Sequence, residues 1–135
     1  GRPIAPDDHR LRYSWLLDLA GVRVGLTHDL PMPELPPNYT VERWKARRFG
    51  TTDIDVLVYG DSHVERIDVV GSTLCVNPGS PTYPHNLNTQ LGTLGFLEID
   101  PGAVRASIWQ LTDDGVAGPT AELTVSRPTV EEPHR

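Results

Sequence analysis

The chain has 135 residues, 38% of them hydrophobic, and a net charge of −6, which suits one globular domain with a modest core. The acidic balance argues against nucleic acid as a stable partner, because phosphate backbones need clustered Lys and Arg. No apolar run approaches the roughly 20 residues that cross a bilayer, so no membrane partner is expected. The single cysteine, Cys75, excludes an intrachain disulfide and favours a reducing, cytoplasmic setting.

The first part of the chain predicts an irregular segment, a strand pair, a loop and a helix. Residues 1–12 are polar and contain proline, and alternating apolar residues then predict strands at 15–19 and 22–27 around a tight turn. The prolines between residues 28 and 38 exclude a regular element there. Residues 40–49 form the one clear predicted helix, with Thr40 as its N-cap and Gly50 just beyond its end.

Apolar runs in the rest of the chain predict further strands. The run at 54–59 has an apolar core, Val56-Leu57-Val58, which is typical of a strand buried on both faces. Additional strands are predicted at 67–70, 73–76, 94–99, 103–111 and 121–125. Residues 127–135 are polar and predicted to be disordered. The sequence therefore favours an α/β fold made mostly of β-strands with one clear helix.

Three of the predicted strands are followed at once by polar clusters, which are Thr27-His28, Gly60-Asp61-Ser62-His63 and Asn77-Pro78-Gly79-Ser80. Since ligands of open α/β sheets collect beyond the carboxyl ends of strands, we expect these clusters to converge on one site. In an extended segment Asp61 and His63 would point the same way, so both could contact one ion. Imidazole and carboxylate donors suit a divalent transition metal such as Mn, Zn, Fe or Ni.

A simpler interpretation of the same residues stays open. A lone His at a strand end is more often a surface or hydrogen-bonded residue than a ligand, and residues 77–80 alone indicate an ordinary Pro-Gly turn. The chain would then be a β-rich domain whose polar strand ends are only turns. In the functional interpretation, Asn77, Gly79 and Ser80 form a rigid loop that supports or bounds a phosphate site.

The order of these motifs, followed by closing strands such as residues 95–99, resembles the C-terminal half of calcineurin-like metallophosphoesterases in their small bacterial and archaeal phosphodiesterase branch. The resemblance covers about residues 15–111, and its most specific part is the run at 77–82. It implies a partial metallophosphoesterase β-sandwich, with residues 13–126 as the C-terminal portion of the domain. It also implies a phosphate-ester substrate, a phosphodiester or phosphomonoester, hydrolysed by a metal-bound hydroxide at a centre that normally holds two ions.

The resemblance further implies that His28, Asp61 and His63 are metal ligands. Asp61 stands where the family usually has His, although a carboxylate is a competent ligand that alters metal preference. Asp29 stands where Gly is common, and His85 lies near the usual place of an Arg.

The N-terminal motifs of the family do not occur before His28. These motifs are Asp-x-His, a bridging Asp after Gly, and an Asn-His pair, and Asp8-His9 lacks both their spacing and the preceding apolar strand. Because a two-metal centre needs a bridging ligand, no catalytic residue is assigned in this chain. The alternative is a non-catalytic, metallophosphoesterase-like binding or scaffold protein, as in the retromer coat. Open sheet edges also favour self-association or pairing with a missing N-terminal half.

Overall fold

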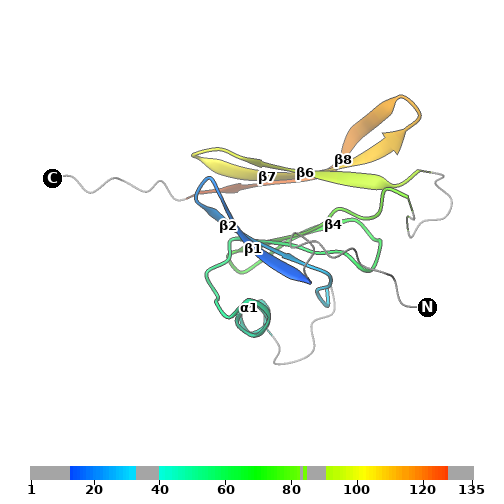
Figure 1. The fold of residues 1–135 in the computed structure, drawn as a ribbon. Coiled ribbons are helices and arrows are strands. Elements are labelled where there is room, and N and C mark those ends of the chain that lie inside the picture. Colours follow the sequence, from blue (N-terminus) through cyan, green and yellow to red (C-terminus); the bar gives the residue numbers. More distant parts are fainter. Residues whose placement is uncertain (1–12, 33–39, 83, 85–90, 128–135) are drawn as a thin grey trace, which may run out of the picture.

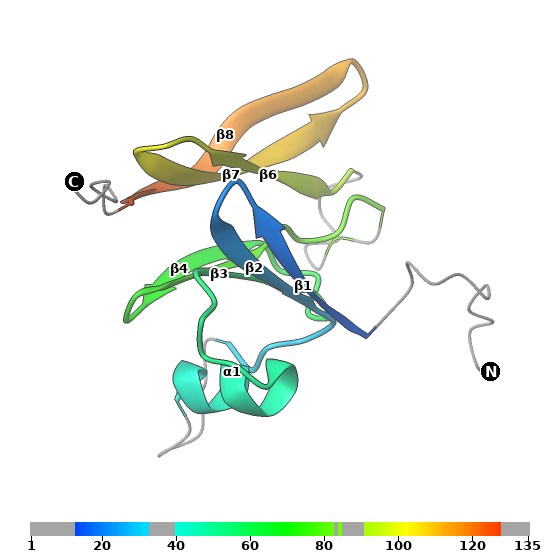
Figure 2. The same cartoon turned by 60° about the vertical axis from the view of Figure 1, so that its left-hand side comes forward.

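Two β-sheets and one helix make up the part of the chain that the computed structural model describes, residues 13–32, 40–82, 84 and 91–127. Figure 1 shows three layers, with a three-stranded sheet, a five-stranded sheet below it, and helix α1 on the far face of the larger sheet. Figure 2 shows the same stacking after a turn of 60°. The predicted α/β class, mostly strands with one helix, is confirmed. The predicted irregular segment at 1–12 and residues 128–135 of the predicted tail lie outside the described residues.

The larger sheet has the strand order β1-β2-β3-β5-β4. Its strands are β1 (Ser14–Leu19), β2 (Val22–Thr27), β3 (Val56–Val58), β4 (Arg66–Val70) and β5 (Thr73–Asn77). The three central strands β2, β3 and β5 are parallel, with Val24 opposite Val56 and Val56 opposite Leu74, whereas β1 and β4 pair antiparallel at the edges. The carboxyl ends of the parallel strands therefore lie at one edge of the sheet, and the expected convergence of the three polar clusters follows.

The central strand β3 is buried on both faces, as its continuous apolar run predicts. Val56 is 1% exposed and belongs to the core between the two sheets, while Leu57 is 0% exposed and faces α1. The two cores are formed on one side by Val22, Val24, Val56, Leu74, Val76, Val104 and Ala106, and on the other by Leu30, Val41, Trp44, Ile54, Leu57, Tyr59 and Cys75.

Helix α1 (Val41–Phe49) begins and ends where its caps predict. The side chain of Thr40 accepts a hydrogen bond from the backbone N–H of Arg43 at 3.1 Å, which satisfies one of the free amides of the first turn. Gly50 has a φ of 74°, and its N–H donates to the carbonyl of Ala46 at 2.9 Å. Trp44, 5% exposed, lies on the face of the helix that packs against the larger sheet.

The smaller sheet has the order β6-β7-β8 and is antiparallel throughout. It consists of β6 (Thr93–Ile99), β7 (Ala103–Thr112) and β8 (Gly115–Ser126). Only residues 121–125 of β8 are predicted from sequence, because Gly115, Gly118 and Pro119 indicate a turn. Instead, the pairing with β7 continues to Thr112 opposite Gly115, with an irregularity between Ile108 and Gln110. Among the described residues, no helix is long and apolar enough to span a membrane.

Two buried groups on the α1 side of the larger sheet have raised pKa values. Burial, then the charge of Asp68, raises the pKa of the Cys75 thiol from 9.0 to about 11. Burial is also the main cause that raises the pKa of Tyr59 to about 12, and its hydroxyl has no hydrogen-bond partner among the described residues. Cys75 is 0% exposed, so it is a core residue.

The stability of the chain should therefore fall at alkaline pH. Above pH 9 the unfolded Cys75 loses its proton while the folded thiol keeps it to about pH 11, so the unfolded state is favoured as pH rises through this window. The loss should reach about 3 kcal/mol for this group. Urea unfolding at about pH 8 and about pH 11 measures it, and Cys75→Ala should show a shallower pH dependence. An equal pH dependence of stability in both proteins would contradict the raised pKa of Cys75 as the cause.

Candidate functional site

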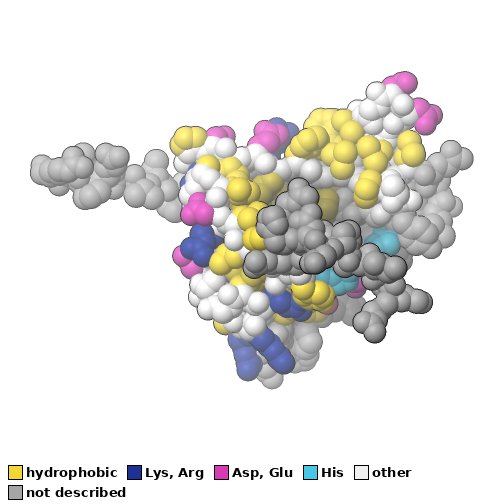
Figure 3. Space-filling model, in the orientation of Figure 1, with side chains coloured by type: hydrophobic (Ala, Val, Ile, Leu, Met, Phe, Trp, Pro, Cys, Tyr) yellow, Lys and Arg dark blue, Asp and Glu magenta, His cyan; other side chains and the backbone are white. Residues whose placement is uncertain are grey.

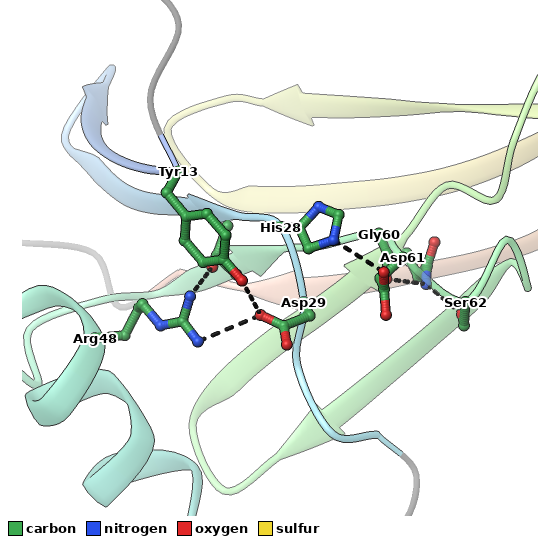
Figure 4. Close-up of polar contacts among 9 residues, drawn as sticks. Tyr13, His28, Asp29, Arg48, Gly60, Asp61 and Ser62 are labelled. Atoms are coloured by element: carbon green, nitrogen blue, oxygen red, sulfur yellow. Dashed lines mark hydrogen bonds and ion pairs between the residues drawn. The ribbon is translucent and has the colours of Figure 1, made fainter. Parts of the chain in front are cut away.

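His28 and Asp61 lie side by side at the carboxyl ends of two neighbouring parallel strands. His28 follows β2 directly, and Asp61 lies three residues beyond β3. Their side chains meet with His28 Nε2 2.9 Å from Asp61 Oδ1, and they are 55% and 61% exposed (Figure 4). The backbone N–H of Gly60 donates to the carbonyl of His28 at 3.0 Å, which joins the two strand ends. The structure therefore brings together two of the three predicted metal ligands.

The segment that carries His63 is not extended, and His28, Asp61 and His63 do not form a three-donor metal group among the described residues. Asp61 has a φ of 75° and His63 a φ of 61°, both in the left-handed region. The N–H of Ser62 donates to the carbonyl of Gly60 at 3.0 Å, which makes this segment a tight turn. The expectation that residues two apart point the same way assumes an extended strand, and the backbone here is a turn instead.

The separation of the two donors is that of a hydrogen bond and is also compatible with two ligands of one ion. Two neighbouring ligands at right angles, each about 2.1 Å from a metal, are about 3.0 Å apart, close to the separation of His28 Nε2 and Asp61 Oδ1. Within the described ranges, however, no group of three or more His, Cys, Asp or Glu side chains is arranged to hold an ion. The described residues thus fit a divalent ion as two donors and do not complete its ligand set.

The loop that begins at Asn77 is tied to the turn that carries Asp61. Asn77 is 1% exposed, and its Nδ2 donates to Ser62 Oγ at 3.0 Å and to the carbonyl of Gly60 at 3.4 Å. Its Oδ1 accepts from the N–H of Gly79 at 3.0 Å. Thr93 Oγ1 donates to the carbonyl of Pro78 at 2.8 Å. The loop is therefore internally braced, and the described contacts of Asn77 support the site rather than face a ligand.

Two residues beside the histidine, Arg48 and Tyr13, were not predicted from the sequence. The guanidinium of Arg48 contacts the residues on both sides of His28, and the Tyr13 ring lies 5.6 Å from the His28 ring. The available signal was the spacing of Trp44 and Arg48, which places both on one face of α1. Figure 3 shows histidine side chains at the surface and Lys and Arg gathered around α1. His85 and Asp8-His9 lie outside the described residues.

Comparison with known proteins agrees with this arrangement of strands and polar ends. Residues 5–102 match the calcineurin-like phosphoesterase superfamily domain, which is more than half of the chain. The chain therefore belongs to the calcineurin-like phosphoesterase superfamily. The match begins before the first described strand, so it does not support the expectation that only the C-terminal half of the domain is present. Among curated proteins, none matches the chain.

Solved structures share the fold at low sequence identity. Vps29 from Cryptosporidium parvum is 22% identical with a TM-score of 0.63, over 85% of this chain and 57% of that one. A conserved uncharacterized protein from Streptococcus pneumoniae TIGR4, described as a predicted phosphoesterase, is 22% identical with a TM-score of 0.61, over 85% and 62%. Wild-type Vps29 from Entamoeba histolytica, complexed with zinc, is 21% identical with a TM-score of 0.55, over 89% and 63%. This chain thus spans less than two thirds of each relative.

Proposed function

We propose that the chain is a metal-dependent phosphoesterase whose divalent transition metal is held in part by His28 and Asp61. The observation that carries this proposal is the 2.9 Å contact between their side chains at the ends of adjacent parallel strands, in a member of the phosphoesterase superfamily. When bound, such an ion supplies Lewis-acid stabilisation of the phosphate oxygens and activates water. The substrate class is a phosphate ester, either a phosphodiester or a phosphomonoester.

The remaining metal ligands come from His63 and from residues outside the described part of the chain in this proposal. His63 lies in the same turn as Asp61 and becomes a donor when that turn rearranges. Asn77 braces the turn through Ser62, and the loop with Gly79 and Ser80 bounds the phosphate. Further donors, including a bridging carboxylate for a second ion, come from outside the described residues or from another chain. The family's usual centre of two ions depends on that contribution.

Hydrolysis of bis-p-nitrophenyl phosphate by the purified chain tests the proposal, with Mn²⁺ or Zn²⁺ added and bound metal counted by mass spectrometry. His28→Ala and Asp61→Ala should each lower metal-dependent hydrolysis by on the order of 100-fold, because each removes a donor. Asp114→Ala, in the exposed turn between β7 and β8, is the matched control and should leave the rate unchanged. Equal rates in all four proteins would exclude this site as the source of the activity.

A second function, a non-catalytic binding or scaffold protein of the same fold, is favoured by one observation. The described residues contain no group of three metal donors, and Asp61 pairs directly with His28. A direct contact of this kind satisfies both side chains without a metal. Purified wild-type protein that shows no metal-dependent hydrolysis, with or without retained metal, supports this second function over the first.

A further inference from the structure

Arg48, in the last turn of α1, reaches across to the end of β2 and contacts the two residues that flank His28. Its Nη1 donates to Thr27 Oγ1 at 3.4 Å, and its Nη2 donates to Asp29 Oδ1 at 3.3 Å. Figure 4 shows the guanidinium extending from the helix toward Asp29, while His28 projects to the other side, toward Asp61. One side chain thus connects the helix to both ends of the short segment that carries the histidine.

Two aromatic rings contact the guanidinium. Its central carbon lies 4.9 Å from the centre of the Tyr13 ring and 4.9 Å from the centre of the Trp44 ring. Trp44 is 5% exposed and fixed in the core under α1. A guanidinium stacks well on such faces, so Arg48 is anchored to the hydrophobic core rather than free at the surface. Its side chain is only 26% exposed.

Tyr13 contacts both Asp29, which accepts from Arg48, and His28 itself. Its hydroxyl donates to Asp29 Oδ1 at 3.4 Å, and its ring packs against the His28 ring at 5.6 Å with an interplanar angle of 47°. Asp29 therefore accepts from Arg48 and Tyr13 together. These contacts hold the Asp29 carboxylate on the α1 side, as Figure 4 shows.

We propose that Arg48 is a positioning residue that fixes the backbone and ring of His28 for its contact with Asp61. Its hydrogen bonds go to Thr27 and Asp29 rather than to the side chains of His28 or Asp61. It therefore acts on His28 through Thr27, Asp29 and Tyr13. Lysine cannot replace it, because a compact ammonium does not reach two separated acceptors while stacking on aromatic rings as a planar fork does. The consequence for metal affinity rests on the proposed function, whereas the consequence for the orientation of His28 does not.

The test compares Arg48→Lys with Arg47→Lys in the full chain. Arg47 is the exposed neighbour on the helix, so its variant makes the same chemical change without altering the contacts of Arg48 to Thr27 and Asp29. Co²⁺ titration followed by absorption measures metal affinity, and the imidazole signals in a ¹H–¹³C NMR spectrum, assigned with His28→Gln, report the ring environment. Arg48→Lys should weaken Co²⁺ binding about tenfold and shift the His28 signal, because supporting partners of ligands have effects of this size. Arg47→Lys should change neither, and urea unfolding of each variant separates this effect from a general loss of stability.

The two readouts separate the failure of this inference from the failure of the proposed function. If wild-type protein binds no Co²⁺ but Arg48→Lys still shifts the His28 signal, Arg48 positions His28 and the metal-dependent function fails. If the His28 signal is unmoved in Arg48→Lys, the inference is overturned, whatever the metal affinity. The same shift in Arg47→Lys would also overturn it, because a substitution away from Thr27 and Asp29 would then have the same effect.

Discussion

Gly92→Ala should lower the free energy of unfolding by about 4 kcal/mol, the sum of broken backbone hydrogen bonds and overpacking. Gly92 lies just before β6, where the chain passes directly over the loop that follows Asn77. A Cβ at this position would overlap the backbone carbonyl oxygen of Ser80 and lie 2.9 Å from the carbonyl carbon of Pro81. Because the obstacle is backbone, no side-chain rotation relieves it.

Three backbone hydrogen bonds at this crossing would be lost or stretched. Gly92 N–H donates to Pro81 at 3.1 Å, Thr93 N–H donates to Ser80 at 3.1 Å, and Leu111 N–H donates to Gly92 at 2.9 Å. Urea unfolding measures the change, and Gly102→Ala is the control. A Cβ at Gly102 would meet only Asp100 Oδ1, at 3.9 Å, so that variant should change stability by less than about 1 kcal/mol. Equal effects of the two substitutions would contradict the close approach of Gly92 to the backbone of Ser80 and Pro81.

Asn77→Asp should destabilise the protein by about 3 to 5 kcal/mol, because it places an uncompensated charge in a buried site. The substitution keeps the size of the side chain and the acceptor for Gly79. It replaces the Nδ2 donor, which now serves Ser62 and the carbonyl of Gly60, by an oxygen. A carboxylate oxygen facing the Gly60 carbonyl is repelled, and the turn that carries Asp61 loses its brace.

The control for Asn77→Asp is Ser62→Ala, which removes one acceptor of the same contact. Ser62 is exposed, so water can satisfy the freed Nδ2, and the expected loss is about 1 kcal/mol. Urea unfolding gives both values, and the stability of Asn77→Asp should recover as pH falls and the new carboxyl is protonated. An Asn77→Asp protein as stable as the wild type at neutral pH would show that Asn77 does not brace the turn.

Hydrophobic periodicity and caps predicted most of the fold correctly. The run at 54–59 identified β3 because a strand buried on both faces needs apolar residues in succession. Thr40 and Gly50 identified both ends of α1, because their hydrogen bonds are local and need no tertiary context. The first half of β8 was missed because Gly115, Gly118 and Pro119 disfavour strands, and only the long pairing with β7 keeps them in one.

The candidate site was predictable in part. Parallel pairing of β2, β3 and β5 brings their carboxyl ends together, so the convergence of His28 with Asp61 followed from strand order. The tight turn that carries Asp61 and His63 did not follow, because a positive φ at a non-glycine residue is set by its surroundings. The role of Arg48 was also out of reach, since its contacts join residues about twenty positions apart through side-chain geometry alone.

The strand order also determines when the site can form during folding. The pairs β1–β2, β4–β5, β6–β7 and β7–β8 are antiparallel hairpins between neighbouring segments, and such local pairs close quickly. Strand β3 must instead insert between β2 and β5, and its parallel pairing joins Val24 to Val56 across a long intervening segment. Loop-closure entropy opposes that non-local step until the β1–β2 and β4–β5 hairpins are present. Because Asp61 follows β3, we expect the contact with His28 to form only after this non-local pairing.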